Sequence, residues 1–373
     1  MSADAADLAP LVVGGGFVVA TVFGWVAAKT NFCTMGAVSD VVNMGHWGRM
    51  RMWLLAIAVA IVGATALAQA GLVDIGKSIY QRSTLNWLSL VVGGALFGVG
   101  MSLAGGCANK NLIRLGGGSL RSLVVLCFLA ISAYMTLKGL FGQWRATWLD
   151  PVAIDLARFG WKDQGLPTLL ASVGIAPQTA RWLAAGAVAL LLLGFVFADR
   201  RFRANPAQWL AGLALGALVV GGWYVSGHLG FGENPETLET GYFGTNTRTL
   251  ESLSFVAPLA YGLELLMLWT DKSLHLSFGI ASALGVALGS AAWALATRSF
   301  RWEGFASLAD LRSQLIGAVL MGFGGVTAMG CTVGQGLTGV STLALGSFLA
   351  LASILAGSAA TLKYITWRAE REA

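Results

Sequence analysis

The chain has 373 residues, of which 56% are hydrophobic and only 11% are charged. About one-quarter of the residues of a soluble domain are charged, so this composition excludes an ordinary water-soluble enzyme or binding domain. The formal net charge of +6 comes from basic residues beside apolar segments, which is typical of membrane-flanking loops and not of a nucleic-acid-binding surface.

Apolar segments long enough to cross a hydrocarbon core of about 30 Å recur along the whole chain. The first follows an acidic start and lacks the basic residues of a signal peptide, so we expect it to remain in the mature protein. Together they predict an all-α polytopic membrane protein with nine to ten transmembrane helices, near residues 10–28, 51–73, 85–104, 119–141, 181–198, 206–226, 252–269, 274–297, 312–330 and 342–362.

Loop composition predicts part of the topology. Arg200, Arg201 and Arg203 follow one apolar segment and Lys363 and Arg371 end another, so we expect both regions on the cytoplasmic side. The segment 142–180 is polar and rich in tryptophan, which predicts an interfacial connector with a short amphipathic helix near 151–160.

The chain contains an internal repeat. One offset of 224 residues superimposes five positions in register, Gly93, Gly98, Gly100, Gly106 and Cys107, on Gly317, Gly322, Gly324, Gly330 and Cys331. A weaker copy begins the chain, because Gly24 precedes Cys33 by nine residues, as Gly98 precedes Cys107. The repeating unit is a span, a cysteine, a polar and Gly-rich stretch, and a second span.

A fourth unit, without a cysteine, is predicted at 209–270, with Ser226 and Gly227 where the others have the thiol. The chain then divides into a half-repeat at 10–141, the connector 142–180 and a second half-repeat at 181–367, all within a single transporter domain, 1–373. Four units in two halves are typical of transporters with internal pseudo-symmetry and a binding site near the membrane midplane.

The stretches after Cys33, Cys107 and Cys331 are too polar or too rich in glycine to continue as spans. At membrane depth such segments occur only where they are buried in protein or line a cavity, so we expect short re-entrant half-helices that begin near each cysteine. Unpaired N–H groups at helix starts attract anions, and Lys110 and Arg114 would add positive charge.

The three cysteines favour a soft, sulfur-containing anion, because a thiol is polarizable and a weak donor. Three other interpretations stay open: simple packing of small apolar residues, a three-thiolate site for Cu(I) or Zn, and a membrane sulfurtransferase or thiol oxidoreductase. No CxxC, haem, flavin or nucleotide motif supports an enzyme, and we expect no cofactor and no resident metal. Cys127 lies in an apolar run and is predicted to serve only in packing.

Three charged residues lie inside predicted spans or half-helices. Asp40 and Arg114 occupy equivalent places in their repeats, which predicts an ion pair between them. Glu264 lies well inside a predicted span, where it serves either in proton coupling or in a helix-packing hydrogen bond.

The phrase 31–37, the frames around Cys107 and Cys331, and the stretch 222–224 resemble the YeeE/YedE family, also called the sulphur-transport or thiosulfate transporter family. The resemblance implies a bacterial inner-membrane permease with inverted repeats, pseudo-222 symmetry and thiosulfate relayed among Cys33, Cys107 and Cys331. It also implies a small TusA-like cytoplasmic sulfurtransferase as partner, and it leaves related sulfur or selenium species open as substrate. We expect the substrate path to be lined by these cysteines and their neighbours Thr34, Gly106, Asn109, Lys110, Gly330, Thr332 and Gln335.

Overall fold

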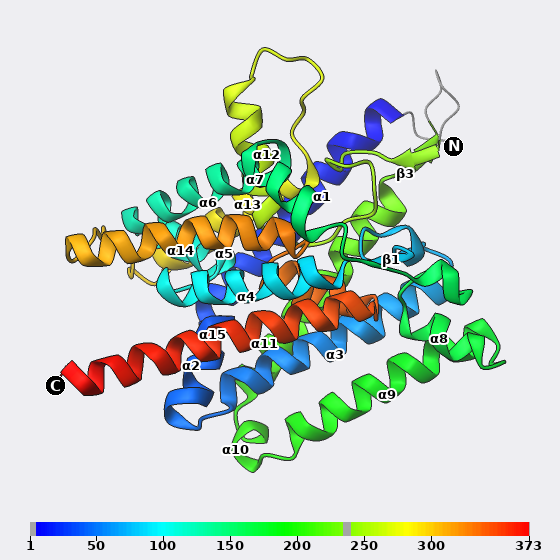
Figure 1. The fold of residues 1–373 in the computed structure, drawn as a ribbon, viewed down its shortest axis with the longest axis horizontal. Coiled ribbons are helices and arrows are strands. Elements are labelled where there is room, and N and C mark those ends of the chain that lie inside the picture. Colours follow the sequence, from blue (N-terminus) through cyan, green and yellow to red (C-terminus); the bar gives the residue numbers. More distant parts are fainter. Residues whose placement is uncertain (1–4, 234–239, 373) are drawn as a thin grey trace.

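The computed structural model describes residues 5–233 and 240–372, which are mostly helical (Figure 1). The long helices are α1 (Ala5–Thr30), α3 (Gly48–Gln69), α4 (Trp87–Leu103), α6 (Leu120–Lys138), α9 (Pro177–Phe197), α11 (Pro206–Tyr224), α13 (Phe278–Ala296), α14 (Leu308–Thr327) and α15 (Leu345–Glu372). The short α-helices are α2 (Thr34–Met44), α5 (Ala108–Gly116), α7 (Leu140–Trp144), α8 (Leu166–Ser172), α10 (Arg200–Arg203) and α12 (Val256–Met267).

The structure also contains 3₁₀ turns and π-helical segments. The 3₁₀ turns are η1 (Ile75–Lys77) and η3 (Leu156–Phe159), and the π-helical segments are η2 (Arg145–Leu149), η4 (Val225–Leu229) and η5 (Gly334–Gly339). Four short strands form two antiparallel pairs, β1 (Thr84–Leu85) with β2 (Ile154–Asp155) and β3 (Phe231–Glu233) with β4 (Thr240–Tyr242).

Eight helical segments within the described residues are long and apolar enough to cross a membrane. One predicted span is wrong: the region 252–269 forms α12, whose 12 residues reach only about 18 Å. Helix α14 has 20 residues but carries Asp310 and Arg312 in its first turns. The chain is an all-α multi-pass membrane protein, and the count of nine to ten spans stays a prediction.

Helices α4 and α14 cross at positions where both have glycine. A Cβ on Gly324 would lie 2.5 Å from the carbonyl oxygen of Gly93, and a Cβ on Gly100 would lie 2.6 Å from that of Gly317. Because Gly93 and Gly100 correspond to Gly317 and Gly324 in the repeat, exchanging the two helices maps this contact onto itself. The duplicated segments therefore pack as a local two-fold pair whose backbones touch. The 222-like symmetry of the whole chain stays a prediction.

The connector does not contain the short helix expected near 151–160. Ile154 and Asp155 pair with β1 instead, and a single 3₁₀ turn, Leu156–Phe159, ends at Gly160, whose φ is 79°. Backbone hydrogen bonds hold the segment in place, from Leu156 N–H to the Ser83 carbonyl (2.9 Å) and from Leu166 N–H to the Leu343 carbonyl (3.0 Å). Pairing with distant backbone thus overrides local helix preference here.

Candidate functional site

Each of the three repeat cysteines caps the start of a short helix. Cys33 precedes α2, Cys107 precedes α5, and Cys331 precedes the helical turn that runs into η5. The residue two positions before each cysteine has a left-handed φ: 51° at Asn31, 66° at Gly105 and 55° at Met329. The prediction that short helices begin at the cysteines is therefore confirmed, and their re-entrant course stays a prediction.

The preceding spans also end in the same way. The residue just before each cysteine donates its N–H to the carbonyl five residues earlier: Phe32 to Ala27 (3.0 Å), Gly106 to Met101 (2.8 Å) and Gly330 to Gly325 (2.8 Å). This bond satisfies the end of one helix while the left-handed residue redirects the chain into the next. Three copies of one backbone motif place the three thiols at equivalent points.

The thiols are buried, with 5% of Cys33, 1% of Cys107 and none of Cys331 exposed. The Sγ atoms of Cys33 and Cys331 each accept a backbone N–H, from Gly36 and Gly334, at 3.3 Å. Sulfur therefore occupies the place that a serine or aspartate oxygen takes at an ordinary helix N-cap. Since sulfur accepts this bond, the S–H of each thiol remains available to donate to a substrate.

Cys107 lies between the other two thiols in their network of interactions. Its thiol lies near enough to Cys33 and Cys331 for a charge on one of them to affect the others, and the Thr332 hydroxyl lies beside it. Within the part of the chain that the structure describes, no group of three or more His, Cys, Asp or Glu side chains is placed to hold a metal ion. Cys127, which was predicted to serve only in packing, is exposed on the surface of α6.

Polar neighbours of the thiols are buried and only partly satisfied. Thr34 begins α2, and the hydroxyl of Thr332 and the side-chain oxygens of Asn109 and Gln335 have no hydrogen-bond partner among the described residues. Leaving a buried polar atom unpaired costs about 1–3 kcal/mol of stability. The unpaired atoms therefore indicate that this segment contacts a polar ligand. Gln335 also donates its amide to the Ala328 carbonyl, which ties η5 to the end of α14.

Glycines bring backbone close to these side chains. A Cβ on Gly106 would lie 2.9 Å from Cγ of Lys110, and a Cβ on Gly330 would lie 3.1 Å from the Gln335 nitrogen. Both predicted glycines therefore leave room for the first turn of the following half-helix.

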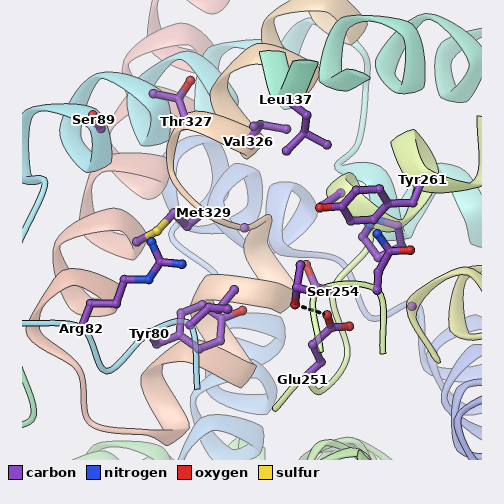
Figure 2. Close-up of a pocket in the computed structure, with 18 of the residues that line it drawn as sticks. Tyr80, Arg82, Ser89, Leu137, Glu251, Ser254, Tyr261, Val326, Thr327 and Met329 are labelled. Atoms are coloured by element: carbon purple, nitrogen blue, oxygen red, sulfur yellow. Dashed lines mark hydrogen bonds between the residues drawn. The ribbon is translucent and has the colours of Figure 1, made fainter. Parts of the chain in front are cut away.

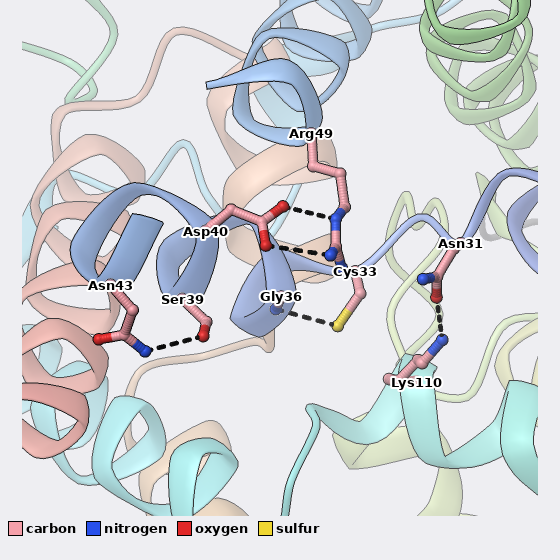
Figure 3. A network of polar contacts seen from close by, with 8 residues as sticks. All are labelled: Asn31, Cys33, Gly36, Ser39, Asp40, Asn43, Arg49 and Lys110. Atoms are coloured by element: carbon pink, nitrogen blue, oxygen red, sulfur yellow. Dashed lines mark hydrogen bonds and ion pairs between the residues drawn. The ribbon is translucent and has the colours of Figure 1, made fainter. Parts of the chain in front are cut away.

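A cationic cluster surrounds Cys33 (Figure 3). Lys110 Nζ donates to Asn31 Oδ1 at 2.5 Å, which joins α5 to the segment before Cys33. Arg49 lies over α2, since a Cβ on Gly36 would meet its guanidinium at 2.5 Å. Arg114 interacts electrostatically with Cys33 as well, so three cations share this end of the thiol row.

The predicted pair between Asp40 and Arg114 is wrong. Asp40 instead forms a two-point ion pair with Arg49, from Nε to Oδ2 at 2.6 Å and from NH2 to Oδ1 at 3.0 Å. The chain reverses at Gly45, with a φ of 65°, and this turn brings the start of α3 beside the end of α2. The local turn decides the partner, and Arg114 has no ion-pair partner within the described residues.

A cavity of about 300 Å³ lies next to the Cys331 segment (Figure 2). Its wall includes Thr327, Met329 and Gly330, which lead directly to Cys331. Tyr80 and Glu251 also line it, and Tyr80 lies close enough to Cys331 for a charge on either group to affect the other. The cavity is large enough for a small polyatomic anion and lies beside the segment that leads to Cys331.

Residues 29–360 match the sulphur transport family. This chain belongs to the sulphur transport family. A thiosulfate transporter TsuA from Spirochaeta thermophila is 27% identical over 359 residues, covering 95% of this chain and 98% of the relative. The thiosulfate transporter TsuA of Escherichia coli strain K12 is 26% identical over 380 residues, covering 96% of each. The family resemblance drawn from the cysteine frames is therefore confirmed.

Several residues of the candidate site are absent from the sequence predictions. Arg49, Tyr80, Arg82 and Glu251 lie in loops or at a helix start, where no repeat marks them. Glu264 is where a span was predicted, but it is ion-paired with Lys138 from α6, which favours a structural role over proton coupling. The sequence signal for charged residues near the thiols was their position in the half-helices after the repeat cysteines, and it identified Lys110, Arg114 and Asp40 but not these four.

Proposed function

We propose that this chain is a permease of the bacterial inner membrane that takes up thiosulfate along Cys331, Cys107 and Cys33. The observation that carries the proposal is the threefold recurrence of a buried thiol at a helix start, in a chain whose relatives are named thiosulfate transporters. A soft thiol complements the terminal sulfur of thiosulfate, and the helix N–H groups and nearby cations complement its oxygens.

The sidedness follows from the basic loop. Arg51 of α3 lies 3.6 Å from Asp199, at the start of α10, so the Cys33 end of the molecule is the end that carries Arg200, Arg201 and Arg203. Basic loops favour the cytoplasm, and the C-terminus of α15 lies at the same end as α10 in Figure 1. The cavity at Cys331 then faces outward, and the anion travels from Cys331 to Cys33.

The relay needs no covalent bond. The anion enters the outer cavity, its terminal sulfur accepts an S–H hydrogen bond from Cys331, and it then moves to Cys107 and Cys33 by the same contact. Lys110, Arg114 and Arg49 stabilise the anion at the inner end. At the N-caps of Cys33 and Cys331 the cysteine sulfur accepts a backbone N–H, so its S–H is oriented before the substrate arrives.

We also propose that the chain has a cytoplasmic protein partner and that it catalyses no reaction itself. A small TusA-like sulfurtransferase would receive the anion at the cationic inner end, and no reaction is assigned to the thiols. Mass spectrometry after exposure to thiosulfate tests this last point, because a persulfide on Cys33, Cys107 or Cys331 would identify the chain as a sulfurtransferase.

The decisive experiment is uptake of radiolabelled thiosulfate in a strain that lacks its own importers. We expect uptake with the wild type, its loss in Cys107→Ala and Cys331→Ala, and its retention in the matched control Cys127→Ala. Competition with sulfite, sulfide, sulfate and selenium oxyanions defines the substrate class. Uptake that is unchanged in both site variants would exclude the relay, and wild type without uptake would exclude the permease.

A further inference from the structure

The outer cavity is poorly suited to attract an anion while all its charges are ionised. Its charged lining residues are the guanidinium groups of Arg82 and Arg145 and the carboxylates of Asp150 and Glu251, so their formal charges cancel. Arg145 Nε is already paired with Asp150 Oδ2 at 3.1 Å, and Asp150 also accepts the Ser89 hydroxyl at 2.7 Å. The net charge of the cavity therefore depends on Arg82 and Glu251.

Glu251 has no cation to compensate it. Within the described residues no ion pair includes it, and the polar partner of its Oε1 is the Thr247 hydroxyl at 2.9 Å. Figure 2 shows its carboxyl group directed toward Ser254, between Tyr80 and Tyr261. Ser254 is two residues before α12, so the carboxyl group lies at the start of the fourth half-helix, which has no cysteine.

We propose that Glu251 is a proton-binding site that couples protons to anion uptake, an inference that rests on the permease function proposed above. When Glu251 binds a proton, the carboxylate becomes a neutral carboxylic acid and the cavity gains one net positive charge, from Arg82. The neutral acid also has an O–H that donates to an anion oxygen. An ionised Glu251 instead repels the anion at the step before Cys331.

The groups that face Glu251 support this assignment. They come from the segment before β1, from η2 and the residue after it, from α12 and from the Cys331 segment: Tyr80, Arg82, Arg145, Asp150, Tyr261 and Cys331. Tyrosine and cysteine are neutral at physiological pH, and the two arginines stay charged. Burial raises the pKa of Glu251 above its ordinary value, which brings its titration toward the pH of the medium.

Linkage makes the effect reciprocal. If protonation of Glu251 strengthens anion binding, anion binding strengthens protonation by the same factor. Anion entry therefore favours proton binding at Glu251, and a bound proton offsets part of the charge that a dianion carries inward.

The test uses the full-length chain in proteoliposomes, with equal pH on both sides and the membrane potential clamped at zero by potassium and valinomycin. Thiosulfate counterflow is measured from about pH 6 to about pH 8 at anion concentrations below saturation. The wild type should slow by up to about tenfold per pH unit above the pKa of Glu251, and Glu251→Gln should change less than about twofold over the range. Glu251→Asp, which keeps a carboxyl group, should keep the pH dependence.

Two controls separate the possible failures. Glu303→Gln alters an exposed carboxylate that pairs with Arg121 away from the cavity, and it should behave as the wild type. During net uptake into proteoliposomes that contain no thiosulfate, an internal pH dye should report proton entry with thiosulfate in the wild type and none in Glu251→Gln. A Glu251→Gln protein that transports with the wild-type pH profile would overturn the inference, whereas a wild type that does not exchange thiosulfate would overturn the permease function instead.

Discussion

At the crossing of α4 and α14 the two helices touch through backbone atoms, so an added methyl group there should lower stability. In Gly324→Ala the new Cβ would lie 2.5 Å from the Gly93 carbonyl oxygen and 2.6 Å from the Phe97 nitrogen. Both distances are about 1 Å inside the optimal separation of roughly 3.5 Å. Neither atom belongs to a side chain that could rotate away, so one helix must move.

Overpacking of this kind costs about 1–3 kcal/mol, and the upper end applies because backbone atoms are hit. With an unfolding entropy of about 2 cal/mol/K per residue, a loss of about 3 kcal/mol lowers the melting temperature of this chain by about 4 °C. The matched control is Gly186→Ala in α9, whose Cβ would have nothing within 4 Å. This control should be neutral or gain up to about 1 kcal/mol, since alanine is the better helix former.

The crossing also sets the distance between two thiols, because α4 leads into Cys107 and α14 leads into Cys331. A displacement of about 1 Å in a positioned site can cost about 100-fold in rate, so Gly324→Ala should lower thiosulfate uptake more than its stability loss explains. Melting is followed by fluorescence-detected size exclusion in detergent, and uptake is measured at equal expression. A Gly324→Ala protein that melts and transports like the wild type would refute the backbone contact.

The remaining predictions concern charges. Asp40→Ala should lower the free energy of unfolding by about 1–2 kcal/mol. This loss is smaller than for a fully buried ion pair because 31% of the Arg49 side chain is exposed. A double-mutant cycle with Arg49→Met measures the coupling energy, and a coupling energy of zero would disprove the pair. Lys110→Met should lower thiosulfate uptake by about tenfold, with only a small loss in melting temperature from the missing bond to Asn31, whereas Lys162→Met, in the connector, should have no effect. The raised pKa of Glu251 makes its folded state favour the protonated form, so its contribution to stability is complete below about pH 4 and is lost as pH rises through the folded pKa. Melting temperatures at low and high pH should therefore differ less in Glu251→Gln than in the wild type.

Membrane energetics explain why the proton matters. Thiosulfate carries two negative charges, and each charge moved inward against a potential of 100 mV costs about 2.3 kcal/mol. A dianion therefore faces about 4.6 kcal/mol per 100 mV. One proton bound at Glu251 and carried with the anion halves this cost, whereas Glu264, already neutralised by Lys138, offers no such site.

The repeat made the thiol positions predictable from the sequence. Cysteines at a constant spacing from span glycines predicted the half-helices, and the left-handed residues before each cysteine confirm them. The fourth unit was placed less well, because Ser226 lies in a continuous helical segment and the half-helix begins only at Val256. Without a cysteine to mark it, the start of that half-helix had no sequence signal.

The sequence by itself determined that the chain lies in a membrane, that it is helical, and that short helices begin at three repeated cysteines, because these properties depend on composition and on spacing along one segment. Only the tertiary structure decided which charges meet. Asp40 pairs with Arg49 through a tight turn, Glu264 with Lys138 across two helices, and Glu251 faces Arg82 across a cavity built from loops. Such partners are set by how distant segments pack, and the energy of a charge pair depends on its separation and on the surrounding dielectric, so no pattern in the chain alone specifies them.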